Sequence, residues 1–487
     1  MSALNLDSLF NPQSIAMIGA SATPGKWGNL ILLNILKGNF RGKVFPVNPK
    51  ADKILGFPCF ASVKDIPEKV DIALITTPAQ YILPLIDECG AKKIPFLVVV
   101  TSNFSEAGDA GVKLEAELVA KAAEYGIRIV GPNTMGVYSA QSQLHALMPM
   151  LMPLEGSVSM FSQSGNVGVQ MMDYGQKEGV GFEKFVSSGN EGDLSCVDYM
   201  DYFAKDDKTK VILGYIEGVE SGRDFLSVAK QISRTKPIVI LKGGRTEVGS
   251  RAAASHTGSL AGAREINRAA FRQAGILEVQ GSLELIDCAK ALANYPIPKG
   301  NRVGIVTRGG GWGVLTADSC EEAGLVVPPL PDDMIRHIDK LLPDYWNRGN
   351  PIDLVATISN DPMPEILGLL AEWDGVDSVI ALGAGFTAFQ FEFSDEVAGP
   401  PELLKVMSDW QNFFQHLADG HDSTLQLIAD LVKKTDKPII SVSTGSQYSH
   451  KEIMESYKIV SFPTPERAVR VLKTMYDYHQ IMNVRGN

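Results

Sequence analysis

The sequence has little of what would place a protein in a membrane, in an oxidising compartment or on nucleic acid. No apolar run reaches the length of about 20 residues that a membrane-spanning helix needs, and the N-terminus lacks the basic start and apolar core of a signal peptide. The five cysteines form no Cys-x-x-Cys pair and no cluster with histidine, which is typical of reduced thiols. A net charge of −11 does not suit a general nucleic-acid or membrane-surface role. We therefore expect a cytoplasmic globular protein with no metal site, no nucleic acid and no membrane among its partners.

Two common nucleotide-binding signatures are also missing. The sequence contains no Gly-x-x-x-x-Gly-Lys-[Ser/Thr], and the turn after the first expected strand is not a strict Gly-x-Gly-x-x-Gly. Where an NAD-binding Rossmann domain would carry an acidic residue for the ribose, Asn48-Pro49-Lys50 stands instead. An NAD-binding domain is the functional alternative at this point, but a lysine there suits a ligand with an additional phosphate.

Five expected strands in the first third of the chain each end in a polar, Gly-bearing or Pro-bearing turn. They are Ser14–Ile18, Lys43–Val47, Asp71–Ile75, Phe96–Val100 and Arg128–Val130. The first turn is rich in glycine and serine and precedes an expected helix, Asn29–Lys37, so its backbone amides can approach a phosphate. In a doubly wound parallel sheet such turns lie along one edge, where ligands bind. Ordinary capping and turn chemistry is the simpler explanation for any single one of them.

A long stretch of small residues, Gly243–Ala263, follows an expected strand, Pro237–Lys242. It reads GGRTEVGSRAAASHTGSLAGA and contains almost no large apolar side chain. A loop of this length inside a compact region is usually functional or disordered. Its one imidazole, His256, is flanked by hydroxyl groups and by a glycine, which permits large backbone excursions. A surface loop with an incidental histidine is the alternative.

The remainder of the chain contains an internal repeat. Residues 158–169 (VSMFSQSGNVGV) match residues 303–314 (VGIVTRGGGWGV) at an offset of 145 residues. Gly189-Asn190 and Gly349-Asn350 form a second echo at an offset of 160. Although any two strand–turn–helix units can look alike, the aligned glycines favour two copies of one fold. We predict an α/β protein in which a Rossmann-like domain (1–145) is followed by two flavodoxin-like domains (150–297 and 300–487), with His145–Gly156 as the first linker; the resemblance described next implies that the first of these is a CoA-binding domain.

The octet Ser-His-Thr-Gly-Ser-Leu-Ala-Gly at 255–262 resembles the phosphohistidine segment of the NDP-forming acyl-CoA synthetases, relatives of succinyl-CoA synthetase. The resemblance extends over nearly the whole chain. It implies a ligase that interconverts a carboxylic acid, CoA and ATP with acyl-CoA, ADP and phosphate. An acyl phosphate and a phosphohistidine on His256 would be the intermediates.

The resemblance also implies roles for individual residues. Glu217, at the end of a strand next to the one that leads to the histidine, would hold the imidazole, with Glu220 as the second candidate. The phosphate would be bound by Ser164, Gly165, Asn166, Thr257 and Gly258. CoA would be bound by Gly19, Ala20 and Ser21 at the pyrophosphate, Lys50 at a phosphate, Thr76, Thr77 and Pro78 on the adenine side, and Ser102 and Asn133 at the pantetheine end.

After Pro438 the sequence ends without the residues that an ATP-grasp fold would need. We therefore expect an α subunit whose ATP-grasp β partner binds Mg-ATP or Mg-ADP, in the α2β2 form usual for the family, with a small carboxylic acid or an acyl-CoA as the other substrate. Two alternatives belong to other classes. One is a CoA-binding regulatory protein of the same fold without turnover. The other is a protein acyltransferase built on this fold. Such a protein should carry an acetyltransferase domain, for which the chain has no room. The acyl group, the direction of the reaction and the choice of ATP or GTP stay open.

Overall fold

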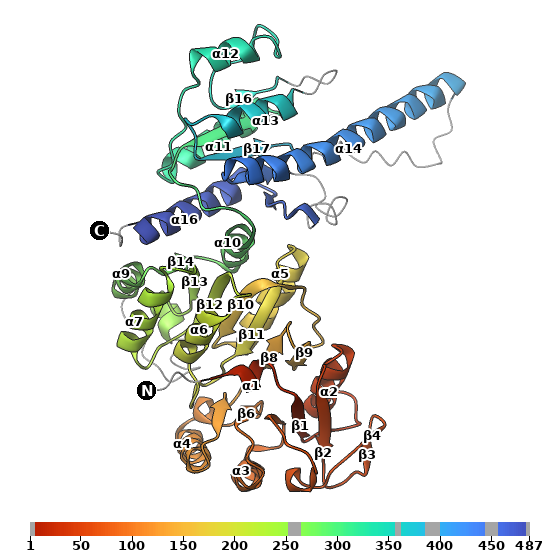
Figure 1. Cartoon of the computed structure of the whole chain (residues 1–487), viewed down its shortest axis with the longest axis vertical. Helices are drawn as coiled ribbons and strands as arrows, with labels where there is room; N and C mark the ends of the chain where they lie inside the picture. Colours follow the sequence, from red (N-terminus) through yellow and green to blue (C-terminus); the bar gives the residue numbers. More distant parts are fainter. Residues whose placement is uncertain (1–4, 252–263, 356–361, 385–399, 444–455, 484–487) are drawn as a thin grey trace. The chain divides into compact units, whose positions relative to one another are not determined.

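The computed structural model describes residues 5–251, 264–355, 362–384, 400–443 and 456–483. The chain divides into two compact units, Met1–Ala289 and Lys290–Asn487, and each is described by itself (Figure 1). Within these described parts, no helix combines the length and the apolar composition needed to cross a membrane.

The first unit begins with a five-stranded parallel sheet in the order β2-β1-β5-β6-β7. Its strands are β1 (Ser14–Ile18), β2 (Lys43–Val47), β5 (Ile72–Ile75), β6 (Phe96–Val99) and β7 (Arg128–Val130), and its main helices are α2 (Trp27–Lys37), α3 (Ile82–Ala91) and α4 (Asp109–Glu124). Ile15 and Met17 of β1 belong to the core that α2 completes, whereas Ala16 and Ile18 belong to the core with α3 and α4. The central strands β1, β5 and β6 are fully buried and read as nearly continuous apolar runs, whereas the less buried β2 and β7 each begin with a basic residue. The predicted strands agree with all five to within one residue. The smaller elements are α1 (Asp7–Phe10), β3 (Lys53–Ile54), β4 (Phe57–Pro58), η1 (Val63–Asp65), η2 (Ala79–Tyr81) and η3 (Ser105–Ala107).

The second sheet of this unit has seven strands in the order β14-β13-β12-β10-β11-β8-β9. They are β8 (Gly136–Ser139), β9 (Leu144–Leu147), β10 (Glu155–Ser162), β11 (Phe182–Ser187), β12 (Val211–Ile216), β13 (Ile238–Lys242) and β14 (Leu277–Val279). The helices are α5 (Gly165–Lys177), α6 (Cys196–Lys205), α7 (Gly222–Ile232), α9 (Arg264–Ala274) and α10 (Ser282–Asn294). The core under α2 continues into this sheet through Phe161, Val186 and Tyr199, so the two sheets share apolar contacts.

The hairpin β8–β9 differs from the predicted domain division. Residues up to 145 were assigned to the first domain, and the linker was predicted to start at His145. In the structure, β8 pairs antiparallel with β11 of the second sheet, with Lys184 opposite Ser139, and β9 pairs with β8. All residues of both four-residue strands are buried, so neither strand shows the alternation of apolar and polar residues that marks a strand in sequence. The division into three domains otherwise stays a prediction.

The second unit contains a five-stranded parallel sheet in the order β16-β15-β17-β18-β19. Its strands are β15 (Val303–Thr307), β16 (Ile352–Asp353), β17 (Ser378–Leu382), β18 (Ile439–Val442) and β19 (Ser461–Phe462). Its helices are α11 (Gly310–Glu322), α12 (Asp332–Ile338), α13 (Met363–Glu372), α14 (Pro401–Thr435) and α16 (Pro465–Asn483). Numbered along the chain, the parallel strands of all three sheets follow the doubly wound order 2-1-3-4-5. The predicted α/β fold class, with one Rossmann-like and two flavodoxin-like parts, is confirmed.

The internal repeat has a structural counterpart at one of its two positions. Helices α5 and α11 both begin and both end 145 residues apart, and each follows the first parallel strand of its sheet. The second echo has no such counterpart, because Asn190 follows β11 whereas Asn350 precedes β16. Asn350 instead pairs with the backbone of β15: its Oδ1 accepts a hydrogen bond from Ile305 N at 2.9 Å, and its Nδ2 donates one to Val303 O at 3.0 Å.

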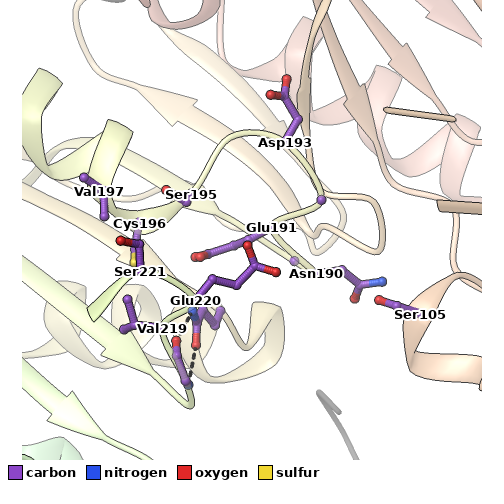
Figure 2. A pocket seen from close by; sticks show the side chains of 14 residues that line it. Ser105, Asn190, Glu191, Asp193, Ser195, Cys196, Val197, Val219, Glu220 and Ser221 are labelled. Carbon is purple, nitrogen blue, oxygen red and sulfur yellow. Dashed lines mark hydrogen bonds between the residues drawn. The ribbon is translucent and has the colours of Figure 1, made fainter. Parts of the chain in front are cut away.

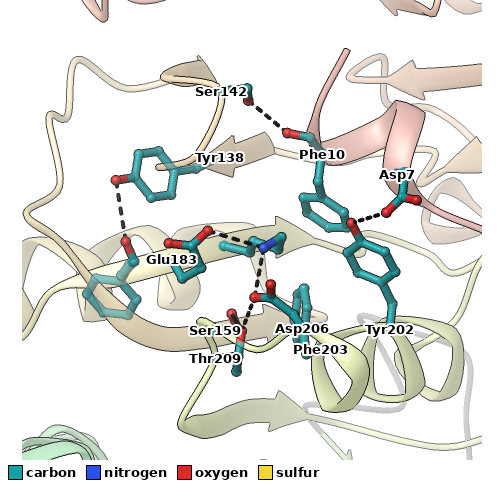
Figure 3. A network of polar contacts seen from close by, with 12 residues as sticks. Asp7, Phe10, Tyr138, Ser142, Ser159, Glu183, Tyr202, Phe203, Asp206 and Thr209 are labelled. Atoms are coloured by element: carbon teal, nitrogen blue, oxygen red, sulfur yellow. Dashed lines mark hydrogen bonds and ion pairs between the residues drawn. The ribbon is translucent and has the colours of Figure 1, made fainter.

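A buried ion cluster lies between β11 of the second sheet and the end of α6 (Figure 3). The Lys184 ammonium on β11 lies 2.8 Å from a carboxylate oxygen of Asp206 and 3.2 Å from one of Glu183. Asp206 also accepts a hydrogen bond from the Thr209 hydroxyl at 2.5 Å. Burial alone would raise the pKa of Asp206, but the hydrogen bonds from Lys184 and Thr209 outweigh it and hold that pKa below its ordinary value.

The same figure shows how the N-terminal helix joins this region. The ring of Phe10 in α1 stacks on Tyr202 of α6 with the centroids 5.2 Å apart, and the Tyr202 hydroxyl donates to Asp7 at 2.9 Å. The first residues of the described chain are therefore held by the second sheet's helix layer as well as by their own domain.

Candidate active site

The turn between β1 and α2 is packed tightly against the end of β5. Gly19 has a φ of +89°, and a Cβ at this position would lie 2.6 Å from Thr76 Oγ1. The Asn29 side chain donates to Ser21 O at 2.9 Å, and the Asn48 side chain donates to Ala20 O at 2.9 Å. These two asparagines fix the backbone of the turn from α2 on one side and from the end of β2 on the other.

The residues predicted to bind CoA all follow strands of the first sheet at its carboxyl edge. Gly19, Ala20 and Ser21 follow β1, Lys50 follows β2, Thr76, Thr77 and Pro78 follow β5, Ser102 follows β6, and Asn133 follows β7. This edge includes the switch point between β1 and β5, where the strand order reverses. The exposed Lys50 and Ser102 leave polar groups at a surface where a phosphorylated ligand can reach them.

The predicted phosphate-binding turn lies after β10, the first parallel strand of the second sheet. Ser164 is the N-cap of α5, and its hydroxyl accepts a hydrogen bond from Val167 N at 3.4 Å. The first amides of a helix, here those of Gly165 and Asn166, have no intrahelical acceptor and carry the positive end of the helix dipole. A Cβ on Gly165 would lie 2.1 Å from Met135 Cγ, so the turn accepts no larger residue there. This is a site where a phosphate can be received.

Glu217 immediately follows β12, the neighbour of β10, and is only 8% exposed. Its Oε1 accepts a hydrogen bond from the Tyr215 hydroxyl at 3.1 Å, and its carbonyl oxygen accepts one from Lys242 Nζ at 2.6 Å. Burial lowers the pKa of Lys242. A Cβ on Gly243 would lie 3.3 Å from Glu217 Cγ. The Glu217 side chain therefore lies against the first residue of the segment that carries His256.

The predicted roles of His256, Thr257 and Gly258 fall in residues 252–263, which lie outside the described residues. The second candidate for the supporting carboxylate is Glu220. It lies in the turn between β12 and α7 and lines a cavity. Among the described residues, no group of three or more His, Cys, Asp or Glu side chains could hold a metal ion.

That cavity has a volume of about 450 Å³ and lies beside Glu217, between the loop after β11 and the turn after β12. Figure 2 shows the side chains of Glu191 and Glu220 extending into it, with Ser105 of the first domain at its rim. Burial raises the pKa of Glu191 to about 7, although the hydrogen bond that the Ser188 hydroxyl donates at 2.7 Å opposes the shift. The sequence analysis did not single out Glu191. The available signal was its position after β11, next to the β10–β12 switch point, where polar strand-end turns converge.

The loop that carries Glu191 also joins the two sheets of the first unit. Along it, Asn190 N, Gly192 N and Leu194 N donate to the carbonyls of Pro132, Gly131 and Ile129 at 2.9, 3.0 and 3.1 Å. The Asp193 carboxylate accepts two hydrogen bonds from the Arg128 guanidinium, at 2.8 and 2.9 Å.

The side chain of Asn190 gives the loop a further link to the first sheet. Asn190 Oδ1 accepts a hydrogen bond from Asn133 Nδ2 at 3.2 Å. The structure thus brings Asn133, predicted at the pantetheine end, into contact with Asn190, which lines the cavity.

Comparison with known proteins places these features in a family. Residues 13–140 match the model for a CoA binding domain, and residues 155–292 match that for the succinyl-CoA ligase like flavodoxin domain. The α subunit of acetate–CoA ligase [ADP-forming] I from Pyrococcus furiosus is 34% identical over 483 residues, which cover 98% of this chain and 98% of that one. Acetate–CoA ligase [ADP-forming] I from Archaeoglobus fulgidus is 42% identical over 77% of this chain, which spans about half (54%) of that longer relative.

A solved structure gives the same result. The acetyl-coenzyme A synthetase 1 of Candidatus Korarchaeum cryptofilum, in complex with phosphate and ADP, superposes with a TM-score of 0.84 at 37% identity and covers 98% of this chain and 97% of its own. The resemblance carried by the histidine octet is therefore confirmed across the chain. This chain belongs to the family of ADP-forming acyl-CoA synthetases, within the succinyl-CoA synthetase superfamily.

Proposed function

We propose that this chain is the α subunit of an ADP-forming acyl-CoA synthetase, with phosphohistidine formed on His256. The observation that carries the proposal is the position of Glu217, a buried carboxylate fixed at the end of β12 and lying against Gly243, where the histidine segment begins. A carboxylate that accepts the N–H of an imidazole fixes its tautomer and strengthens the other nitrogen as a nucleophile. Glu217 is thus a suitable partner for an imidazole that attacks a phosphoryl group.

The proposed reaction has three steps in the direction of ATP formation. Phosphate attacks the thioester of acyl-CoA, which gives an acyl phosphate and releases the CoA thiol. The His256 nitrogen then attacks the phosphorus, so that the P–O bond to the acyl group breaks and the carboxylate leaves. Phosphohistidine finally transfers its phosphoryl group to ADP. The amides at the start of α5, with Ser164, Thr257 and Gly258, stabilise the phosphoryl oxygens while the group resides on the histidine.

CoA is proposed to bind along the carboxyl edge of the first sheet. Support comes from the gathering of all the predicted CoA residues at that edge and from the match of residues 13–140 to a CoA binding domain. The contact of Asn190 with Asn133 supports a pantetheine arm that reaches from this edge toward the cavity beside Glu217.

The partner is proposed to be an ATP-grasp β subunit in an α2β2 assembly, with Mg-ATP or Mg-ADP bound there and a small carboxylic acid or acyl-CoA as the second substrate. The Pyrococcus relative, which matches this chain from end to end, is itself an α subunit, and this supports a partner chain. All five cysteines lie in the described part and are free thiols, which supports a reducing, cytoplasmic location.

The experiment that tests the function is phosphate transfer to His256. The purified chain, incubated with acyl-CoA and radioactive phosphate, should acquire a label that is lost in acid and kept in base, on the peptide that contains His256. His256→Ala should abolish the label, and Glu217→Gln should slow its formation while CoA binding is unchanged. An acid-stable label on Ser255 or Thr257 would contradict the mechanism. CoA binding with no label at all would favour the regulatory alternative.

A further inference from the structure

One side chain connects the two halves of the candidate active site. Gln163 immediately precedes Ser164, the N-cap of the phosphate-binding helix α5, and its side chain points to the turn that follows β12. Its Oε1 accepts hydrogen bonds from Glu217 N at 2.6 Å and from Gly218 N at 3.1 Å. Its Nε2 donates to Gly218 O at 2.7 Å.

These contacts continue the parallel ladder between β10 and β12 beyond its last pair. The strands end their regular register at Ser162 opposite Tyr215, and Gln163 N still donates to Tyr215 O at 3.0 Å. One residue further, the primary amide of Gln163 takes the place of a backbone peptide, with one acceptor and one donor in use. These hydrogen bonds satisfy the N–H groups of Glu217 and Gly218 and the carbonyl of Gly218 at the end of the ladder, where an unmade hydrogen bond is costly.

The same amide is in contact with the cavity. Gln163 is one of its lining residues, and a hydrogen bond from Gln163 is among those that partly offset the rise of the Glu191 pKa through burial. Gln163 therefore contacts the phosphate-binding turn through its backbone, and both the Glu217 turn and Glu191 through its side chain.

We propose that Gln163 is a positioning residue, which holds the Glu217 backbone at a fixed distance from the amides of α5 so that carboxylate, imidazole and phosphoryl group can align. This inference rests on the proposed phosphohistidine function. Reaction between held groups requires the reacting atoms within about 3–3.5 Å, and displacements on the order of 1 Å are costly. Tyr215 and Lys242 contact the carboxylate and the carbonyl of Glu217, so the two N–H groups that Gln163 binds are a separate anchor.

The first arm of the test measures the anchor itself, without reference to activity. Hydrogen exchange is followed by mass spectrometry on peptides that contain Glu217 and Gly218, in the full chain. Gln163→Leu should speed exchange of these amides, Gln163→Glu should stay closer to the unmodified chain because its carboxylate still accepts from both amides, and the exposed Gln141→Leu should change nothing. Unchanged exchange in Gln163→Leu would overturn the inference whatever the fate of the proposed function.

The second arm is a double-mutant cycle on the rate of His256 phosphorylation in the complete enzyme. Gln163→Leu alone should lower kcat on the order of ten- to a hundredfold and change KM for CoA far less, because none of the residues predicted to bind CoA is among the hydrogen-bond partners of its side chain. In the Glu217→Gln background the same change should have almost no further effect, since a positioning residue acts through Glu217. If the rate loss of the double variant equals the product of the two single losses, Gln163 acts independently of Glu217 and has only a general structural role. That result would overturn the proposal.

Two further results separate the possible failures. If Gln163→Leu does not fold, Gln163→Glu takes its place in the cycle, because it keeps the acceptor for both amides, loses the donor to Gly218 O and to Glu191, and should show a smaller, equally non-additive loss. If the unmodified enzyme forms no phosphohistidine, the proposed function fails and the positioning role fails with it, while the exchange data still show whether Gln163 anchors the turn.

Discussion

At the edge of the first sheet, Gly19 has both a special backbone conformation and no room for a side chain. Gly19→Ala would place a methyl group 2.6 Å from Thr76 Oγ1 and 3.2 Å from Thr77 N, in a backbone with a φ of +89°. We expect CoA binding to weaken by at least about tenfold, because the turn must move away from Thr76 and no longer presents its amides to the pyrophosphate. Calorimetric titration of the full chain with CoA measures this, and NAD titrated in parallel tests the choice of ligand.

Gly56→Ala is the matched control for this substitution. Gly56 has a φ of +84°, but no atom lies within 4 Å of the position that a Cβ would occupy, so the alanine there costs only backbone strain, about 1–2 kcal/mol. CoA affinity should be unchanged in this variant. Equal loss of affinity in both variants would show that strain, and not the Gly19–Thr76 contact, is responsible. Tighter binding of NAD than of CoA would contradict the assignment of the edge.

The sequence can suggest candidate groups for the site, but not the contacts that hold them. Glu217 could be recognised because it ends an apolar strand next to the one that leads to His256, and the structure places it against Gly243. The part played by Gln163 could not, because its contacts depend on the register of β10 against β12, which pairs Ser162 with Tyr215. A shift by one residue would have turned its side chain to the other face of the sheet.

At the scale of elements, the ion cluster between β11 and α6 makes a prediction about stability. Asp206→Ala removes one carboxylate from the buried Lys184, whose side chain is 1% exposed, while Glu183 remains. We expect a loss of about 2–4 kcal/mol, because a buried ammonium is left with less compensation. The free energy of unfolding is measured by urea denaturation, with hydrogen exchange of peptides from β11 and α6 as the readout.

The control for this variant is a surface pair on the same helix. Asp201→Ala breaks the exposed pair with Lys205 and should cost less than about 0.5 kcal/mol. The pH dependence has a definite sign: the folded-state pKa of Asp206 is lowered, so its contribution is present above the unfolded-state pKa of about 4 and is lost as the pH falls through the folded value. A cluster contribution that grew on acidification would contradict this account.

Elements with strong apolar signals were predictable, and short ones were not. The five strands of the first sheet are mostly apolar because helices cover both faces of the sheet, and each was predicted to within one residue. Strands β8 and β9 have four residues each and no period, and β8 pairs with a strand that comes much later in the chain. The correspondence of α5 with α11 followed from aligned glycines, whereas the likeness of Asn190 and Asn350 was local sequence only.

At the scale of the whole molecule, the proposed split of the reaction between two subunits predicts an incomplete cycle. The chain alone should accept phosphate from an acyl phosphate but should not pass it to ADP, and adding the ATP-grasp subunit should restore ATP formation. The physical reason is that in-line transfer requires the reacting atoms to be within about 3–3.5 Å, so the phosphohistidine must reach a second site on the partner. Luminescent detection of ATP, with and without the partner, measures both halves.

Shortening the histidine segment provides the companion experiment. Deleting six residues on the N-terminal side of Ser255 should block transfer to ADP and spare CoA binding, since the CoA residues lie on a different sheet. Vigorous ATP-dependent synthesis of acyl-CoA by the purified chain alone would contradict the split. So would ATP formation at an undiminished rate by the shortened chain with its partner.

The loop from Asn190 to Leu194 has a consequence for how this protein can be divided and recombined. Three backbone hydrogen bonds and the Arg128–Asp193 pair attach it to the end of the first sheet, and β8 crosses in the opposite direction to pair with β11. A fragment that ends at residue 145 would contain β8 without its partner β11, and only the first half of β9. In a chimera, a transplanted CoA-binding domain would need to bring a matching segment for this loop. An exchange between relatives should therefore keep the two sheets of the first unit, Met1–Ala289, together.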